Sequence, residues 1–152
     1  MSDKITIQIC SFDIPSKSAG KKIFKKSIQD VINSEKFKTN LEKGRVLSLM
    51  SHKDRYNSEM SDKIPYEDSM LISPYLAGYG KRAWIDESKN VFMGEIELAD
   101  NENGKLIKDM LKKGFDVGTS MSVSATADNN YYYVDDILSL GDFTKISWCF
   151  VK

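Results

Sequence analysis

Cysteine, histidine and proline are scarce in this chain of 152 residues, which has two cysteines, one histidine and three prolines. Cys10 and Cys149 lie near opposite ends, each within an apolar run and without a CxxC pair or histidine at ligand spacing. We therefore expect free thiols and neither a disulfide framework nor a zinc site. The scattered carboxylates show no ligand pattern, so we expect no metal and no other cofactor.

A net charge and long apolar runs are missing as well. The 22 basic and 22 acidic side chains cancel, so no overall field attracts nucleic acid or an anionic membrane. No apolar run approaches the length of a membrane span, and the N-terminal segment carries Asp3 and Lys4 without the apolar centre of a signal peptide. These absences predict an intracellular protein with no nucleic-acid partner and no membrane partner.

The pattern of apolar residues predicts a single domain over residues 1–152. Segments that alternate between apolar and polar side chains indicate strands, and segments with helical spacing indicate helices. The run of lysines near residue 21 is interpreted as the solvated face of a helix. The predicted order is a strand at 4–12, a helix at 18–34, a strand at 45–51, a surface loop at 53–69, a strand hairpin at 70–86 and 90–98, a helix at 101–114, a strand at 115–128, and strands at 131–134 and 137–151 with a bend at Gly141 and Asp142.

Two features of this pattern bear on chemistry. In the strand FDVGTSMSVSATAD, alternation places apolar side chains on one face and small hydroxylated ones, including Ser120 and Ser122, on the other. The single histidine, His52, follows the buried strand at 45–51. A serine hydroxyl becomes a useful nucleophile when a base takes its proton, and histidine is the usual base near neutral pH.

Several segments in order resemble the phage prohead proteases between residues 44 and 151. They are GRVLSLMSHKD, then VFMGEIELAD, then NGKLIKDMLKKG leading into VGTSMSVS, and finally FTKISWCFV. The resemblance implies an α+β fold with a mainly antiparallel, barrel-like sheet and flanking helices, similar to the herpesvirus capsid assembly proteases. It also implies that His52 is the catalytic histidine and Ser120 the nucleophile, with Ser122 as the alternative.

The third catalytic group stays open. The herpesvirus enzymes use a second histidine, which this chain lacks. Ser147 occupies the position where related phage sequences have serine or aspartate and is our choice, with Asp116, Asp142 and Glu95 as competitors. Two departures from the family pattern bear on activity. Some relatives have an arginine shortly after the nucleophile, whereas Met121 follows Ser120 here. The family's catalytic histidine is usually followed by proline, whereas Lys53 follows His52 here.

The resemblance implies a serine endopeptidase that cleaves the phage scaffold protein, the major capsid protein and itself. It further implies a homo-oligomer that acts in the host cell cytoplasm, inside the prohead. Two rival hypotheses remain. One is a catalytically silent homologue that serves as a scaffold or capsid-assembly protein, and the other is an unrelated binding module whose hydroxylated strand is only a surface.

Overall fold

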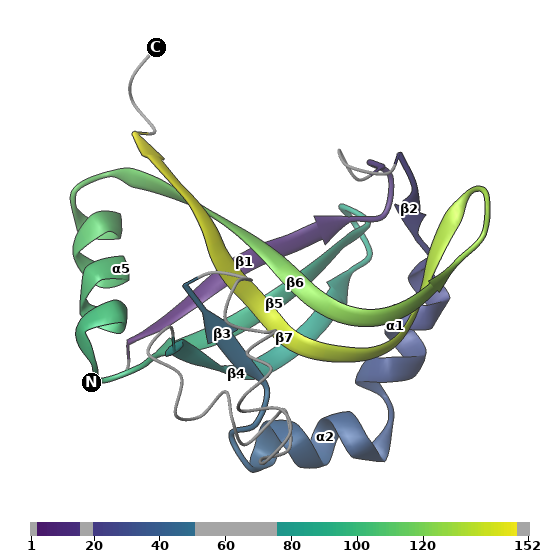
Figure 1. The fold of residues 1–152 in the computed structure, drawn as a ribbon, viewed down its shortest axis with the longest axis horizontal. Coiled ribbons are helices and arrows are strands. Elements are labelled where there is room, and N and C mark those ends of the chain that lie inside the picture. Colours follow the sequence, from purple (N-terminus) through teal and green to yellow (C-terminus); the bar gives the residue numbers. More distant parts are fainter. Residues whose placement is uncertain (1–2, 16–19, 51–75, 149–152) are drawn as a thin grey trace, which may run out of the picture.

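The computed structural model describes residues 3–15, 20–50 and 76–148, of which 116, 117, 138 and 144–148 are described by their backbone alone. Helices flank a strongly bent sheet, with α5 at one side of the view in Figure 1 and α1 and α2 on the other. The elements are β1 (Lys4–Ser11), β2 (Lys22–Ile23), α1 (Lys25–Ile32), α2 (Glu35–Glu42), β3 (Leu47–Leu49), β4 (Leu76–Asp86), β5 (Val91–Leu98), α5 (Glu102–Lys112), β6 (Phe115–Ala127) and β7 (Tyr131–Trp148).

The strands follow the order β1-β5-β4-β3-β7-β2, with β6 added to β7. All pairs are antiparallel except β2 with β7 and β3 with β7, which are parallel. The α+β class is confirmed. The barrel-like closure is wrong for the described strands, because β1 pairs only with β5 and β6 only with β7. β1 and β6 contact each other but cross at an angle, so no ladder joins them.

The predicted helix at 18–34 is wrong in its start. Phe37 and Leu41 continue its apolar spacing and suggested an extension toward Gly44, but they belong to a separate helix. Lys22 and Ile23 form the short strand β2 beside Tyr131 and Tyr132, and α1 begins only at Lys25. A separate helix, α2, follows because the Ser34 hydroxyl accepts a hydrogen bond from the Phe37 N–H at 3.2 Å and caps its first turn.

The two strands predicted at 131–134 and 137–151 form one strand, β7, of 18 residues. It pairs with β6 from Phe115↔Trp148 to Ala127↔Tyr132. Between these pairs β6 advances 12 residues and β7 advances 16, so β7 carries four extra residues as bulges. Bulges bend a strand without ending it and increase its twist, which explains why the predicted bend at Gly141 and Asp142 does not interrupt the strand.

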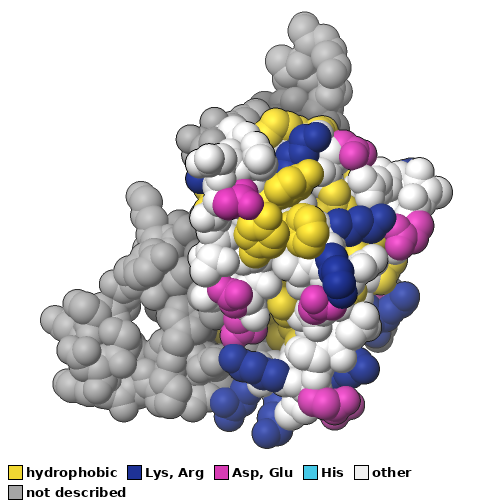
Figure 2. Space-filling model, turned by 90° about the vertical axis from the view of Figure 1, so that its right-hand side faces the viewer, with side chains coloured by type: hydrophobic (Ala, Val, Ile, Leu, Met, Phe, Trp, Pro, Cys, Tyr) yellow, Lys and Arg dark blue, Asp and Glu magenta, His cyan; other side chains and the backbone are white. Residues whose placement is uncertain are grey.

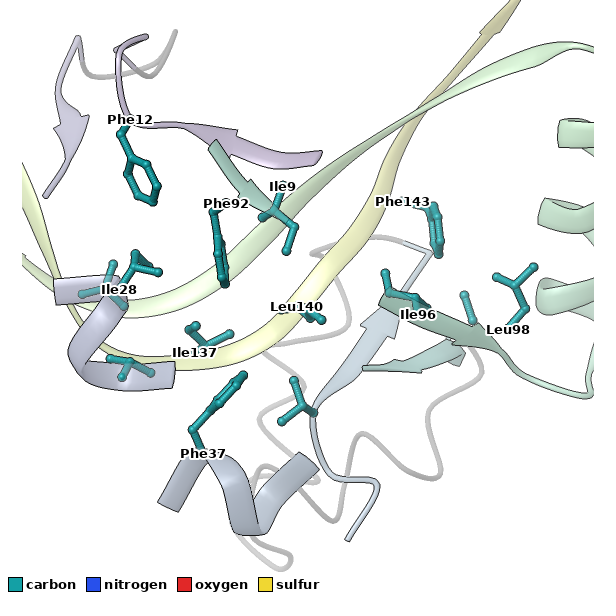
Figure 3. Packing of buried hydrophobic residues seen from close by; sticks show 14 of the residues in the cluster. Ile9, Phe12, Ile28, Phe37, Phe92, Ile96, Leu98, Ile137, Leu140 and Phe143 are labelled. Atoms are coloured by element: carbon teal, nitrogen blue, oxygen red, sulfur yellow. The ribbon is translucent and has the colours of Figure 1, made fainter. Parts of the chain in front are cut away.

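The hydrophobic core fills the space between the bent sheet and the helices (Figure 3). Side chains from both N-terminal helices, from the outer strand β1 and from the central strands β5 and β7 meet there. Val46, the residue before β3, belongs to this main core, whereas Leu47 and Leu49 form a second cluster with Leu76, and Ser48 between them is also fully buried. β3 is therefore buried on both faces. The labelled core residues in Figure 3 are Ile9, Phe12, Ile28, Phe37, Phe92, Ile96, Leu98, Ile137, Leu140 and Phe143.

Candidate active site

The hydroxylated face of β6 is present as the sequence predicted. Met121 and Val123 pack against the main core, so the alternating residues Ser120 and Ser122 lie on the opposite face. Their surroundings differ. The Ser122 side chain is buried, with 7% of its surface exposed, whereas Ser120 is half-buried and lines a groove. Ser120 is therefore the more accessible of the two hydroxyls.

Two polar residues of β7 lie opposite these serines. In the register of the hairpin, Ser120 pairs with Asp142 and Ser122 pairs with Ser139. Directly opposed residues of an antiparallel pair have Cβ atoms about 4.5–5.5 Å apart. One of the extra residues of β7 lies between Ser139 and Asp142, and this bulge brings the two side chains to the same face. The Ser139 hydroxyl donates a hydrogen bond to Asp142 Oδ2 at 2.9 Å.

Asp142 is a fully buried carboxylate, with 0% of its surface exposed. Its Oδ1 accepts a hydrogen bond from the Leu49 N–H at 2.9 Å. A carboxylate removed from water is costly unless it is hydrogen-bonded, and these two bonds from different strands supply that compensation. Asp142 therefore connects the end of β3 to the hydroxylated face of β6 and β7.

β3 is the strand that leads to the predicted base. His52 lies outside the described residues, and Met50 is the last described residue before it. In the chain His52 follows Met50 by two residues. At the end of β3 the Leu49 N–H contacts Asp142.

The structure separates the other predicted candidates from Ser120. The backbone of Ser147 pairs with Asp116, four residues along β6 from Ser120, which corresponds to about 13 Å at the rise of a strand. The side chains of Ser147 and Asp116 lie outside the described part. Glu95 is on β5, where its neighbours Gly94 and Ile96 face β7 across the bent sheet. Strand alternation therefore directs the Glu95 side chain to the opposite face. Of the proposed third members, Asp142 is the one in register with Ser120.

Ser139 and Ser48 were missed by sequence reasoning. The Ser48 hydroxyl is buried and has no hydrogen-bond partner among the described residues, and Ser139 is fully enclosed between β3 and β6. The sequence feature that could have identified them is a serine flanked by apolar residues within each strand. That signal is weak, because serine is also common on exposed strand faces.

Cys10 gives a test of the groove beside Ser120, because its side chain lines the same groove. Burial raises the pKa of the Cys10 thiol from 9.0 to about 12. At pH 8 the thiolate fraction, which controls alkylation, falls about a thousandfold relative to the unfolded chain. We expect iodoacetamide to modify Cys10 rapidly in denaturant and about a thousandfold more slowly in the native protein, as measured by peptide mapping that distinguishes it from Cys149.

The contribution of Cys10 to folding stability depends on pH in a definite direction. Because the folded protein holds the Cys10 thiol protonated, its contribution to stability is complete below pH 9 and is lost as the pH rises toward 12. Equal alkylation rates of Cys10 in the native and denatured protein would contradict the shielding of this thiol from water in the fold.

Two searches of the described residues gave negative findings. No group of three or more histidine, cysteine, aspartate or glutamate side chains is arranged to hold a metal ion within 3–15, 20–50 and 76–148. No helix in these ranges is both long and apolar enough to cross a membrane.

Comparison with known proteins gave no relative. No family model matches the chain, and neither a curated protein nor a solved structure is significantly similar to it.

Proposed function

We propose that the protein is a serine endopeptidase that matures a phage prohead, with a fold related to the herpesvirus capsid assembly proteases. The proposal comes from the ordered sequence segments. The structural observation that supports it best is the buried Asp142 carboxylate, which lies opposite Ser120 in the β6–β7 register and accepts a hydrogen bond from the end of the strand that leads to His52.

In this proposal Ser120 attacks the carbonyl carbon of the scissile peptide bond while His52 takes the hydroxyl proton. The C–N bond then breaks, His52 gives the proton to the leaving amine, and an ester links the substrate to Ser120. Water, deprotonated by His52, hydrolyses this ester and restores the serine. No cofactor takes part in either step.

Asp142 takes the role of the third group, in place of Ser147. In this role the Asp142 carboxylate stabilises the positively charged imidazole that forms during the reaction. Its bond to the Leu49 N–H also fixes the end of β3, three residues before His52 in the chain. Met121 and Ser122 follow Ser120 without an arginine, so backbone N–H groups stabilise the oxyanion.

The proposed substrates are the scaffold protein and the major capsid protein of the same phage, and the enzyme itself. The proposed setting is a homo-oligomer inside the prohead in the host cytoplasm. Self-association inside the prohead would restrict cleavage to assembled particles.

Co-expression with the scaffold protein tests this function. We expect wild type to shorten the scaffold, and His52→Ala to reduce the rate at least about a thousandfold because the serine loses its base, with intact mass spectrometry as the measurement. Circular dichroism of the variant controls for folding. If wild type leaves the scaffold whole even in assembled particles, the silent scaffold or capsid-assembly homologue replaces the enzyme.

A further inference from the structure

Three aromatic rings gather at the end of the sheet where β2 lies beside β7. The centre of the Phe24 ring lies 5.4 Å from that of Tyr131 and 5.0 Å from that of Tyr133. The parallel pairing of Lys22 with Tyr131 brings these distant parts of the chain together. Phe24 keeps 36% of its surface exposed, so part of its ring is open to solvent. Figure 2 looks onto this end of the molecule and shows hydrophobic side chains gathered there, with lysines, arginines and some carboxylates around them.

A hollow beside this ring cluster is lined with lysines. Its volume is about 480 Å³, which is within the range of typical ligand sites. Lys22, Lys25 and Lys26 line it, together with two rings of the cluster. Asp13 is the only carboxylate among the described residues of the lining, and its Oδ1 accepts a hydrogen bond from the Asn90 side chain at 2.9 Å. The lining therefore combines cations with aromatic rings.

The chain itself neutralises these lysines only weakly. Within the described ranges no carboxylate lies within 4.0 Å of the Lys22 Nζ. Lys25 forms an ion pair with Glu87, and Lys26 forms one with Asp30 at 3.2 Å. Both pairs include side chains that are open to water, and exposed pairs of this kind contribute little to stability. An anion of higher charge density can replace these carboxylates at small cost.

The position of two of the lysines opposes the stability of α1. Lys25 and Lys26 are the first two residues of this helix, where the helix dipole favours acidic side chains and disfavours cations. The first turn contains no acidic residue, and the N-cap residue Phe24 makes no capping hydrogen bond with its side chain. The positive end of the dipole therefore adds to the lysine charges. A role in binding an anion accounts for lysines at a position where helix formation does not favour them.

We propose that this end of the molecule binds single-stranded nucleic acid. A base stacks on the exposed part of the Phe24 ring, and the phosphates of the strand contact Lys22, Lys25 and Lys26. Proteins that bind single strands without sequence preference combine stacking on aromatic side chains with a positively charged surface that follows the backbone. An acidic protein segment would use the lysines and leave the rings unused, so a nucleic acid matches more of the site.

The site goes beyond the proposed function, because it needs no reaction at Ser120. It shares Ile23 alone with the groove that Ser120 lines. The cancelling charges of the whole chain predicted no nucleic-acid partner, but that prediction depended on a sum over all residues. The β2–β7 pairing joins a lysine-rich segment to a tyrosine-rich one that lies far from it in the sequence.

Fluorescence anisotropy of a labelled oligonucleotide of about twelve deoxythymidines tests the site in the full chain. Three phosphate contacts to a single strand predict a slope of log K against log salt of about −2. We therefore expect the affinity to fall about twentyfold between about 50 and 200 mM salt. Lys22→Gln combined with Lys26→Gln should reduce the slope to about −0.7. Phe24→Leu should weaken binding at least about fivefold, because the stacking ring is lost.

Lys105→Gln combined with Lys113→Gln is the matched control. Both lysines are exposed and belong to α5 or its C-cap, on the other side of the molecule from β2 in Figure 1. This pair should leave the affinity and the slope unchanged. An oligoglutamate of equal charge has no bases to stack and should bind at least about fivefold more weakly than the oligonucleotide. Amide shifts of the ¹⁵N-labelled wild type, which depend on no variant, should be confined to residues 22–29, 13, 90 and 131–133.

Four results would each overturn the proposal. The first is binding of the oligonucleotide more weakly than about 1 mM at low salt. The second is a loss of slope in the α5 control pair equal to that of the Lys22 and Lys26 pair. The third is unchanged affinity of Phe24→Leu, or oligoglutamate that binds as tightly as the oligonucleotide, which would identify an acidic protein segment as the ligand. The fourth is a set of amide shifts centred on β6.

Discussion

Replacing Ser120 with alanine is expected to lower the rate of scaffold cleavage at least about a thousandfold, because no acyl-enzyme can form without the Oγ atom. The variant should fold normally. Ser120 is only half-buried and no described hydrogen bond depends on its hydroxyl, so the free energy of unfolding should change by less than about 0.5 kcal/mol. The time course of scaffold cleavage, followed by intact mass, gives the rate, and urea denaturation gives the stability.

Ser122→Ala is the matched control for this variant. Ser122 is on the same strand face two residues away, but its side chain is buried opposite Ser139. We expect the control to cleave at a rate within about tenfold of the wild-type rate. The substitution can disturb the positioning of neighbouring groups, but it leaves the nucleophile in place. If Ser122→Ala is inactive while Ser120→Ala still cleaves, the nucleophile is Ser122. If both variants cleave as wild type does, the serine peptidase proposal is wrong.

Asp142→Asn should have a large effect on both activity and stability. An amide nitrogen replaces one carboxylate oxygen, so either the Leu49 N–H or the Ser139 hydroxyl loses its acceptor. An unsatisfied buried polar group costs about 1–3 kcal/mol of unfolding free energy. The variant also removes the negative charge that stabilises the imidazolium, which should lower the cleavage rate about 10²–10⁴-fold under conditions where the variant remains folded.

Asp135→Asn is the control, because Asp135 is an exposed carboxylate on the same strand. Its stability should change by less than about 0.5 kcal/mol, and its activity should match wild type. Urea denaturation and the scaffold assay, applied to both variants, separate the two effects. An Asp142→Asn protein that is destabilised but cleaves at the wild-type rate would leave Asp142 with a structural role alone and would return Ser147 to consideration.

Sequence reasoning predicted the elements whose signals are local. The alternation of β1, β5 and β6, the turn between β4 and β5, and the apolar face of α5 are all carried by neighbouring residues. The Asn101 side chain, for example, accepts a hydrogen bond from the Gly104 N–H at 2.9 Å and starts α5. The division between α1 and α2 was equally local, since Ser34 caps the second helix, but the continuous helical spacing of apolar residues concealed it.

Part of the candidate site was likewise predictable from the sequence, and part was not. The hydroxylated face of β6 follows from the alternation of a strand, and the sequence alone determined that Ser120 and Ser122 share it. Only the tertiary structure decided that Ser122 is buried and Ser120 is accessible. It also decided which carboxylate is in register with Ser120, because the bulges in β7 set the alignment of the two strands.

What the sequence determined by itself is therefore the class of the fold, most strand positions and the set of hydroxyls that share one face of β6. The pairing of β2 with Tyr131 and Tyr132, the unclosed edges of β1 and β6, and the bond between Leu49 and Asp142, 93 residues apart, were decided by the tertiary structure. The physical reason is that periodicity reports which side of an element is apolar, whereas register and burial depend on packing between segments distant in the chain.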